Sequence, residues 1–143
     1  MTESCNPLIS RAASIMKASS TATIATVDDN GFPSASAISS IRTSGIENAW
    51  FVTGLSAGKT KRLLKNSKCS LCYCDGDNNV TLRGTAEVLT DPDTKRDLWD
   101  DRFIRHFSEG VEDPEYCVLK FTAKKAVLYV DSQSEEYDLG NAV

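Results

Sequence analysis

Short runs of β-favouring residues, separated by turn signals, dominate the pattern of apolar and polar positions along the chain. Asp28–Gly31 and Asp75–Asn79 are typical hairpin turns, and Gly84 inside a β-favouring run indicates a bulge or bend. Short strands joined in this way are typical of an antiparallel barrel rather than a parallel sheet. The predicted strands are seven, at residues 21–27, 32–42, 48–53, 69–74, 80–89, 116–121 and 126–130.

Apolar residues at helical spacing predict three helices, at residues 7–19, 58–67 and 92–107. The last of these opens with Asp91-Pro92, a capping side chain followed by proline at the first helical position. Residues 1–6 and the acidic stretch 132–143 are expected to be loose tails. The sequence therefore predicts a single domain that is mainly β with flanking helices.

The segment Trp50–Lys65 combines a predicted strand, a small-residue loop at Gly54–Gly58 and a predicted helix. A loop that leads into a helix presents free N–H groups and the positive end of the helix dipole, so it favours an anion, and Lys59 and Lys61 add full charges. Only three residues separate the two glycines, whereas a nucleotide-triphosphate loop needs four. The alternative is an ordinary strand–loop–helix corner with a solvated basic face.

Charge and cysteine content narrow the function classes. The net charge of −4 argues against a general nucleic-acid binder. The first residues contain no long apolar run, so neither a secretory signal nor a membrane span is expected. Five cysteines without such a signal predict free thiols in a reducing cytoplasm.

The only histidine, His106, is predicted to be a surface residue of the third helix. A nucleophilic triad needs a base beside its nucleophile, and a single helical histidine is a poor candidate for that role. The carboxylates of Asp97, Asp100 and Asp101 are expected on the solvated face of the same helix rather than in a glycosidase pair.

Cys69, Cys72 and Cys74 resemble half of a metal site. On a strand, however, the side chains at 72 and 74 share one face and the side chain at 69 points to the other. Because no second cluster of cysteine or histidine completes four ligands, we expect half-buried free thiols. A redox-sensing thiol stays open as an alternative.

The second predicted strand is unusually rich in serine, and packing alone does not require so many hydroxyl groups. These serines either supply donors and acceptors to a polar, planar ligand along the strand or simply form an exposed face. They are Ser34, Ser36, Ser39 and Ser40.

Several short motifs follow one another between residues 8 and 131, and their order is more specific than any one of them. They are Asp29-Asn30-Gly31-Phe32-Pro33, Trp50-Phe51-Val52-Thr53, Lys59, Asn66-Ser67-Lys68, Gly84-Thr85-Ala86-Glu87-Val88, and Trp99 and Phe107 ahead of Gly110-Val111-Glu112-Asp113-Pro114. In this order the chain resembles the pyridoxamine 5′-phosphate oxidase-like, FMN-binding split-barrel proteins, and within them the short bacterial general-stress branch.

The resemblance implies a six- to seven-stranded antiparallel split barrel that binds FMN between the subunits of a homodimer. It places the isoalloxazine and ribityl chain along the second strand, the phosphate near Thr53 and Lys59, and the polar side chain of Asn79 against the flavin of the second subunit. Related barrels hold FAD, deazaflavin or haem instead. The cofactor-binding residues implied by the resemblance, substitutes included, are Ser36, Ala37, Ile38, Ser39, Val52, Thr53, Ser56, Lys59, Thr60 and Asn79.

Three departures from the family pattern shape the expected activity. No basic residue lies near Ser36, and Ala57 stands where the family has a serine, for which Ser56 or Thr60 can substitute. The sequence also ends without the segment that completes the substrate site of true pyridoxamine phosphate oxidases, so oxidation of vitamin B6 is not expected.

Two hypotheses of function follow from the resemblance, and one from the cysteines. The first is an FMN-dependent oxidoreductase that passes electrons between a reduced nicotinamide and an unidentified small molecule. The second is a non-catalytic protein that binds or senses a flavin, a deazaflavin or haem on the same fold. The third is a cysteine-based redox or metal protein.

Overall fold

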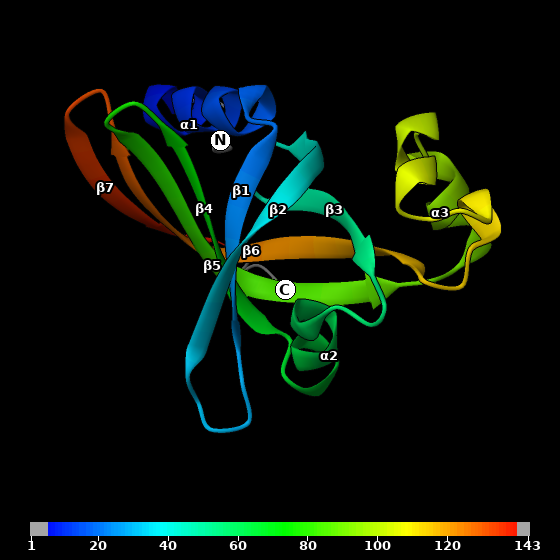
Figure 1. Ribbon diagram of the computed structural model, residues 1–143. Helices are drawn as coiled ribbons and strands as arrows, with labels where there is room; N and C mark the ends of the chain where they lie inside the picture. Colours follow the sequence, from blue (N-terminus) through cyan, green and yellow to red (C-terminus); the bar gives the residue numbers. More distant parts are fainter. Residues whose placement is uncertain (1–5, 140–143) are drawn as a thin grey trace.

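Six antiparallel strands close into a barrel in the computed structural model, which describes residues 6–139 (Figure 1). The strand order is β3-β2-β1-β4-β5-β6, and pairing of β3 with β6 completes the ring. The predicted split barrel with flanking helices is therefore confirmed. The barrel strands are β1 (Thr21–Val27), β2 (Pro33–Ser44), β3 (Asn48–Gly54), β4 (Lys68–Asp75), β5 (Asn78–Leu89) and β6 (Tyr116–Val130).

The long strand β6 connects the two ends of the molecule. It pairs with β5 along most of its length, with β3 over its first half and with a seventh strand, β7 (Gln133–Asp138), over its second half. The sequence predicted two strands here, at 116–121 and 126–130, and that division is wrong. The chain stays extended because a bulge absorbs the irregularity: Ala123 lies opposite Gly84 and Lys125 opposite Arg83, which leaves Lys124 without a partner residue on β5.

Gly84 explains why the bulge forms at this point. A Cβ atom on Gly84 would overlap the backbone carbonyl oxygen of Thr122, so β5 and β6 approach as closely as they do only with glycine here. The bulge predicted at Gly84 is thus confirmed in place, although the extra residue belongs to the facing strand.

The strand β7 corrects the expectation of a loose C-terminal tail for residues 133–138. Its turn is formed by Asp131 and Ser132, which have φ angles of 52° and 67°. Two successive left-handed residues suit a tight hairpin, although neither is glycine. Lys125 forms an ion pair with Glu136 (3.0 Å), and Tyr137 packs against the main core. The expectation for residues 1–5 and 140–143 lies outside the described residues.

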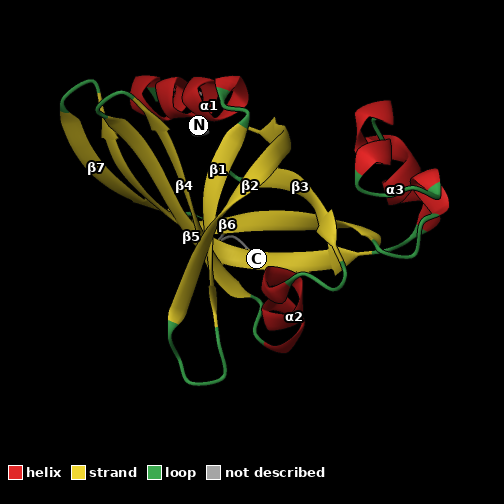
Figure 2. Cartoon of the chain, viewed as in Figure 1, coloured by secondary structure: helices red, strands yellow, loops and turns green. Residues whose placement is uncertain are grey.

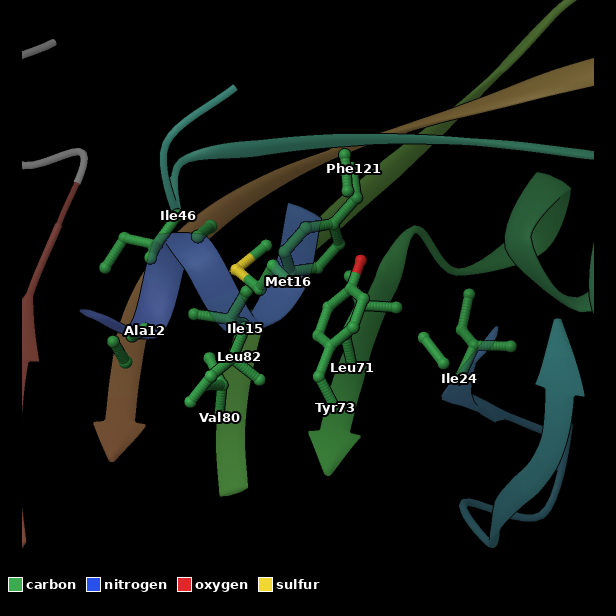
Figure 3. Packing of buried hydrophobic residues seen from close by; sticks show 14 of the residues in the cluster. Ala12, Ile15, Met16, Ile24, Ile46, Leu71, Tyr73, Val80, Leu82 and Phe121 are labelled. Carbon is green, nitrogen blue, oxygen red and sulfur yellow. The ribbon is translucent and has the colours of Figure 1, made fainter. Parts of the chain in front are cut away.

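Three α-helices flank the barrel, namely α1 (Pro7–Ala18), α2 (Gly58–Lys65) and α3 (Pro92–Leu98). The Oδ1 atom of Asn6 caps α1 by accepting from the N–H groups of Leu8 and Ile9. The helix lies across one end of the barrel and inserts Ala12, Ile15 and Met16 among the core side chains (Figures 1 and 3). Within residues 6–139 no helix has the length and apolar character needed to cross a bilayer.

The third predicted helix, 92–107, is much shorter in the structure. It ends at Leu98, and two 3-10 turns follow, η2 (Asp101–Arg105) and η3 (Gly110–Glu112) (Figure 2). Trp99 and Asp100 are extended, and the Asp100 carboxylate accepts from the N–H of Arg102, which starts a new turn in place of continuing the helix.

Two apolar clusters hold the described residues together. The main cluster fills the barrel beneath α1, and Figure 3 shows Val80 and Leu82 close to Ile15 of that helix. A smaller cluster joins α3 and η2 to the first half of β6, with Leu98, Phe107, Tyr116 and Val118 as its buried members. This second cluster supports a lobe, formed by α3, η2 and η3 (residues 92–112), that stands beside the barrel in Figure 1.

Candidate functional site

An open hollow of about 400 Å³ lies between the barrel wall and the η2 lobe. The strands β2 and β3 supply its floor, the loop before α2 closes one end, and η2 forms the opposite wall. Its lining is Ser39, Ile41, Val52, Thr53, Gly54, Ser56, Ala57, Phe103, His106, Phe107 and Glu115. The hollow thus combines apolar and aromatic walls with a polar end, as small-molecule sites commonly do.

The polar end is the small-residue loop that the sequence singled out. The N–H of Ala57 and the hydroxyl of Thr60 both donate to the carbonyl of Gly54, at 3.1 and 2.7 Å, and so fix the turn. The helix begins at Gly58 with no capping side chain from Ala57. Because the first turn lacks a side-chain acceptor, its N–H groups and the helix dipole favour an anion beside this loop.

A carboxylate from a distant part of the chain already uses the donors of this loop. The Oε2 atom of Glu115 accepts from the N–H of Ser56 (3.0 Å) and also from its hydroxyl. The two residues are 59 positions apart, and the pairing of β3 with β6 brings them together. Sequence reasoning missed Glu115 because no local pattern signals this contact.

A cationic side chain lies beside the start of α2. The Nε atom of Arg62 donates to the hydroxyl of the fully buried Thr26 (2.7 Å), which anchors the guanidinium. A Cβ atom on Gly58 would lie 3.0 Å from Nη1 of Arg62, so glycine leaves room for this group at the first turn. The sequence offered one signal for this arrangement, the four-residue spacing between Gly58 and Arg62 on one helix.

The structure brings four of the sequence-predicted residues into the hollow, namely Ser39, Val52, Thr53 and Ser56. Lys59 is half-buried one residue into α2, next to the lining rather than in it. The hydroxyl of Thr60 is buried and is engaged by Gly54, so it supports the loop from within.

Four other predicted residues lie outside the hollow. Ser36 and Ala37 are exposed on an earlier part of β2, and the side chain of Ile38 belongs to the main core with 5% exposure. Asn79 lies at the opposite end of β5, where it pairs with Cys74 and Tyr129. Within one copy of the chain, these positions therefore contribute no side chain to the hollow.

The three acidic residues of the expected helix face are each engaged by a neighbour. Asp97 pairs with Arg42 (2.8 Å), Asp100 with Arg102 (2.9 Å), and Asp101 accepts from the indole N–H of Trp99 (3.0 Å). Hydrogen bonds from Arg102 lower the pKa of Asp100 to about 2. None of the three lines the hollow. His106 is exposed, as expected, but it lies on the rim of the hollow, which the sequence did not indicate.

The cysteine side chains follow the predicted alternation along β4. The Sγ atoms of Cys72 and Cys74 are 3.9 Å apart on one face, and Cys69 is buried on the other. Burial raises the pKa of Cys69 to about 12 and that of Cys117 to about 11, so both stay protonated and weakly nucleophilic at neutral pH. Residues 6–139 contain no group of three or more cysteine, histidine or acidic side chains placed to hold a metal ion.

Solved structures of other proteins share this architecture. A solved structure from Clostridium acetobutylicum, described as related to general stress protein 26 of Bacillus subtilis in the pyridoxinephosphate oxidase family, is 27% identical, with a TM-score of 0.82 over 92% of this chain and 94% of its own. General stress protein 26 from Bacillus anthracis is 17% identical, with a TM-score of 0.77 over 92% and 98%.

A NimC/NimA family protein from Clostridium acetobutylicum is 16% identical, with a TM-score of 0.72 over 92% of this chain and 93% of its own. At these two lower identities the likeness shows the fold alone. No curated protein matches the sequence. The family model described as pyridoxamine 5′-phosphate oxidase matches residues 9–129, most of the length. The chain therefore belongs to the pyridoxamine 5′-phosphate oxidase family.

Proposed function

We propose that this protein binds FMN in the hollow and acts as a flavin-dependent oxidoreductase on a small molecule. The observation that carries the proposal is the pairing of an uncapped helix start with an apolar, aromatic-walled hollow. The first suits a terminal phosphate, and the second suits a flat ring. The carboxylate of Glu115 on both donors of Ser56 is a stand-in for a phosphate oxygen and supports this use of the loop.

The residues of the hollow divide the binding task between them. Ser56, the first-turn N–H groups and Lys59 would hold the phosphate, and Thr53 lines the hollow beside them. Ile41 and Val52 would carry one face of the ring system, with Phe103 on the facing wall, and so exclude water from it. When bound, FMN would supply the electron transfer, while the protein would supply position and electrostatics.

The proposal includes a second copy of the chain and a reducing cytoplasm. Asn79 lies away from the hollow of its own chain, so it would reach a flavin only from a partner subunit. The free thiols of Cys69, Cys72, Cys74 and Cys117 are consistent with a reducing compartment. FAD would bind through the same loop if its longer tail left the hollow on the open side.

A non-catalytic flavin-binding or sensing protein is the second candidate. The contact between Glu115 and Ser56 favours it, because a carboxylate that holds the anion donors weakens the affinity for a phosphate. Turnover separates the two candidates: the oxidoreductase oxidises a reduced nicotinamide in the presence of FMN and an acceptor, and the binding protein does not.

The first experiment is an absorption spectrum of the purified protein before and after incubation with FMN and desalting. A retained flavin spectrum is the expected result. A haem-type absorption band would leave the fold unaffected but would mean that the protein binds haem instead of FMN. A colourless protein that retains no FMN would contradict the proposal.

A further inference from the structure

We propose that Glu115 is an internal competitor for the phosphate subsite and thereby sets how strongly the hollow discriminates FMN from flavins without a phosphate. The identity of the ligand rests on the proposed function. The presence of a charged competitor in the anion loop rests on the geometry of Glu115 and Ser56 alone.

The loop is shaped around the carboxylate. Both polar hydrogens of Ser56 point at the same oxygen, Oε2 of Glu115. A Cβ atom on Gly54 would come within 2.5 Å of that oxygen, so the absence of a side chain at this position leaves room for the carboxylate where it lies. Gly54 and Ser56 together form a cradle for one anionic oxygen.

No cation neutralises this carboxylate. Among residues 6–139, none of the ion pairs involves Glu115, and neither Lys59 nor Arg62 forms one with any acidic group. A phosphate that approached the loop would therefore meet a full negative charge at the donors it needs. Two like charges a few ångströms apart repel strongly, so the carboxylate has to leave before the phosphate can enter.

The displacement needs only a side-chain rotation. The backbone of Glu115 is held on both sides: its N–H donates to Oδ1 of Asp113 (3.0 Å), and its carbonyl accepts from the N–H of Leu55 (2.8 Å). Within the part of the chain that the structure describes, the carboxylate itself is held only by Ser56. The loop can thus exchange an internal anion for a ligand anion while β3 and β6 stay paired.

The test compares two ligands that differ only in the phosphate. Glu115→Gln removes the charge but keeps an oxygen that can accept from Ser56. Titration by flavin fluorescence is expected to show FMN binding to this variant about tenfold more tightly than to the wild type, since a tenfold change needs only about 1.4 kcal/mol. Riboflavin is expected to bind both proteins equally. Glu112→Gln, which removes an exposed charge outside the hollow, is the matched control and should change neither affinity.

Unchanged FMN affinity in Glu115→Gln, or an equal gain for riboflavin, would overturn the competitor role. Loss of affinity for both ligands would mean that Glu115 supports the loop instead. A second readout does not depend on flavin: inorganic phosphate should shift the backbone amide resonances of Ser56 and Gly58 at lower concentration in Glu115→Gln than in the wild type. If phosphate does so but no flavin binds, the proposed function fails and the competitor role stands; if phosphate shifts neither protein, the competitor role fails.

Discussion

The two apolar clusters of this molecule differ in how completely they are closed. Main-cluster side chains such as Ile24, Leu71 and Phe121 have no exposed surface, and the barrel strands surround them (Figure 3). The second cluster has few buried members, and around them Trp99 and Phe103 stay only half-buried. The hollow lies on the side of β3 where Val52 packs against the second cluster, while Phe51 on the other face of β3 belongs to the main cluster. One wall of the hollow is therefore a strand with the sealed core behind it, and the other is a thin aromatic layer.

The difference separates a rigid wall from an adjustable one. The floor residues Val52 and Thr53 belong to β3, where they pair with Val118 and Cys117 of β6, and the preceding residues of β3 pair with both β2 and β6. Opposite them, η2 is a single short turn held mainly by ring contacts, such as Trp99 on Phe103 (5.6 Å) and Trp99 on Tyr116 (5.3 Å). Segments with few buried contacts open most readily, so we expect the η2 wall to adapt to a ligand while the floor stays fixed.

The largest expected effect comes from breaking the sealed core. Phe121→Ala should lower the free energy of unfolding by about 3–5 kcal/mol, because it leaves a cavity among fully buried neighbours. The matched variant Phe103→Ala removes the same ring from the half-exposed layer and should cost about 1 kcal/mol. Urea unfolding of both variants measures the contrast, and equal losses would contradict the division into two regions.

The sequence predicted the barrel better than it predicted the lobe, for physical reasons. Hairpin turns and β-branched runs are local signals, and they located β1 to β5 with small errors. Strand β6 and the lobe depend on distant partners: the continuity of β6 comes from the bulge beside Gly84, and the early end of α3 comes from Asp100, whose side chain starts a separate turn. The acidic strand β7 looked loose because its pairing with β6 leaves no local signature.

The same distinction applies to the site. The corner formed by β3, the loop Gly54–Gly58 and α2 was predictable because its strand, its glycines and its helix are consecutive in the sequence. Residues that reach the hollow from elsewhere were not: Phe103, His106, Phe107 and Glu115 arrive from the lobe and the start of β6. Ile38, a strand position implied by resemblance, carries a side chain that points into the core and so does not line the hollow of its own chain.

A smaller effect is expected where the rigid floor meets the loop. Lys59→Ala should weaken FMN binding by about 1–3 kcal/mol, the usual scale for a lost charge-assisted hydrogen bond, and leave the unfolding free energy nearly unchanged. The exposed Lys61 provides the control, since it lies two residues further along α2, on a different face of the helix from Lys59, and Lys61→Ala removes an equal charge. Thr53→Val should weaken binding less than Lys59→Ala. Equal affinity in Lys59→Ala and the wild type would show that the phosphate assignment is wrong.

The smallest effect is expected for the hydrogen bond that joins the lobe to the start of β6. Tyr116 starts β6 and donates its hydroxyl to the carbonyl of Lys95 in α3 (2.7 Å), so it ties the aromatic layer to the helix above it. Tyr116→Phe keeps the ring contacts and should cost about 1 kcal/mol in urea unfolding at neutral pH. A loss as large as that of Phe121→Ala would mean that the lobe is as tightly coupled as the core.

The dependence of the unfolding free energy on alkaline pH distinguishes the contribution of the Tyr116 hydroxyl from that of ring packing. Burial raises the pKa of Tyr116 to about 12, above the ordinary value of 10.0. The folded state therefore holds the phenol proton where the unfolded chain has released it, and the free energy of unfolding falls as the pH rises from about 10 to about 12. Burial also raises the pKa of Tyr73, in the sealed core, to about 12. Tyr73 therefore contributes the same fall in unfolding free energy to the wild type and to Tyr116→Phe. Tyr116→Phe should lose less unfolding free energy between about pH 10 and about pH 12 than the wild type, because it lacks the Tyr116 phenol and keeps Tyr73. Parallel plots of unfolding free energy against pH for the two proteins would mean that Tyr116 already reaches solvent in the folded state.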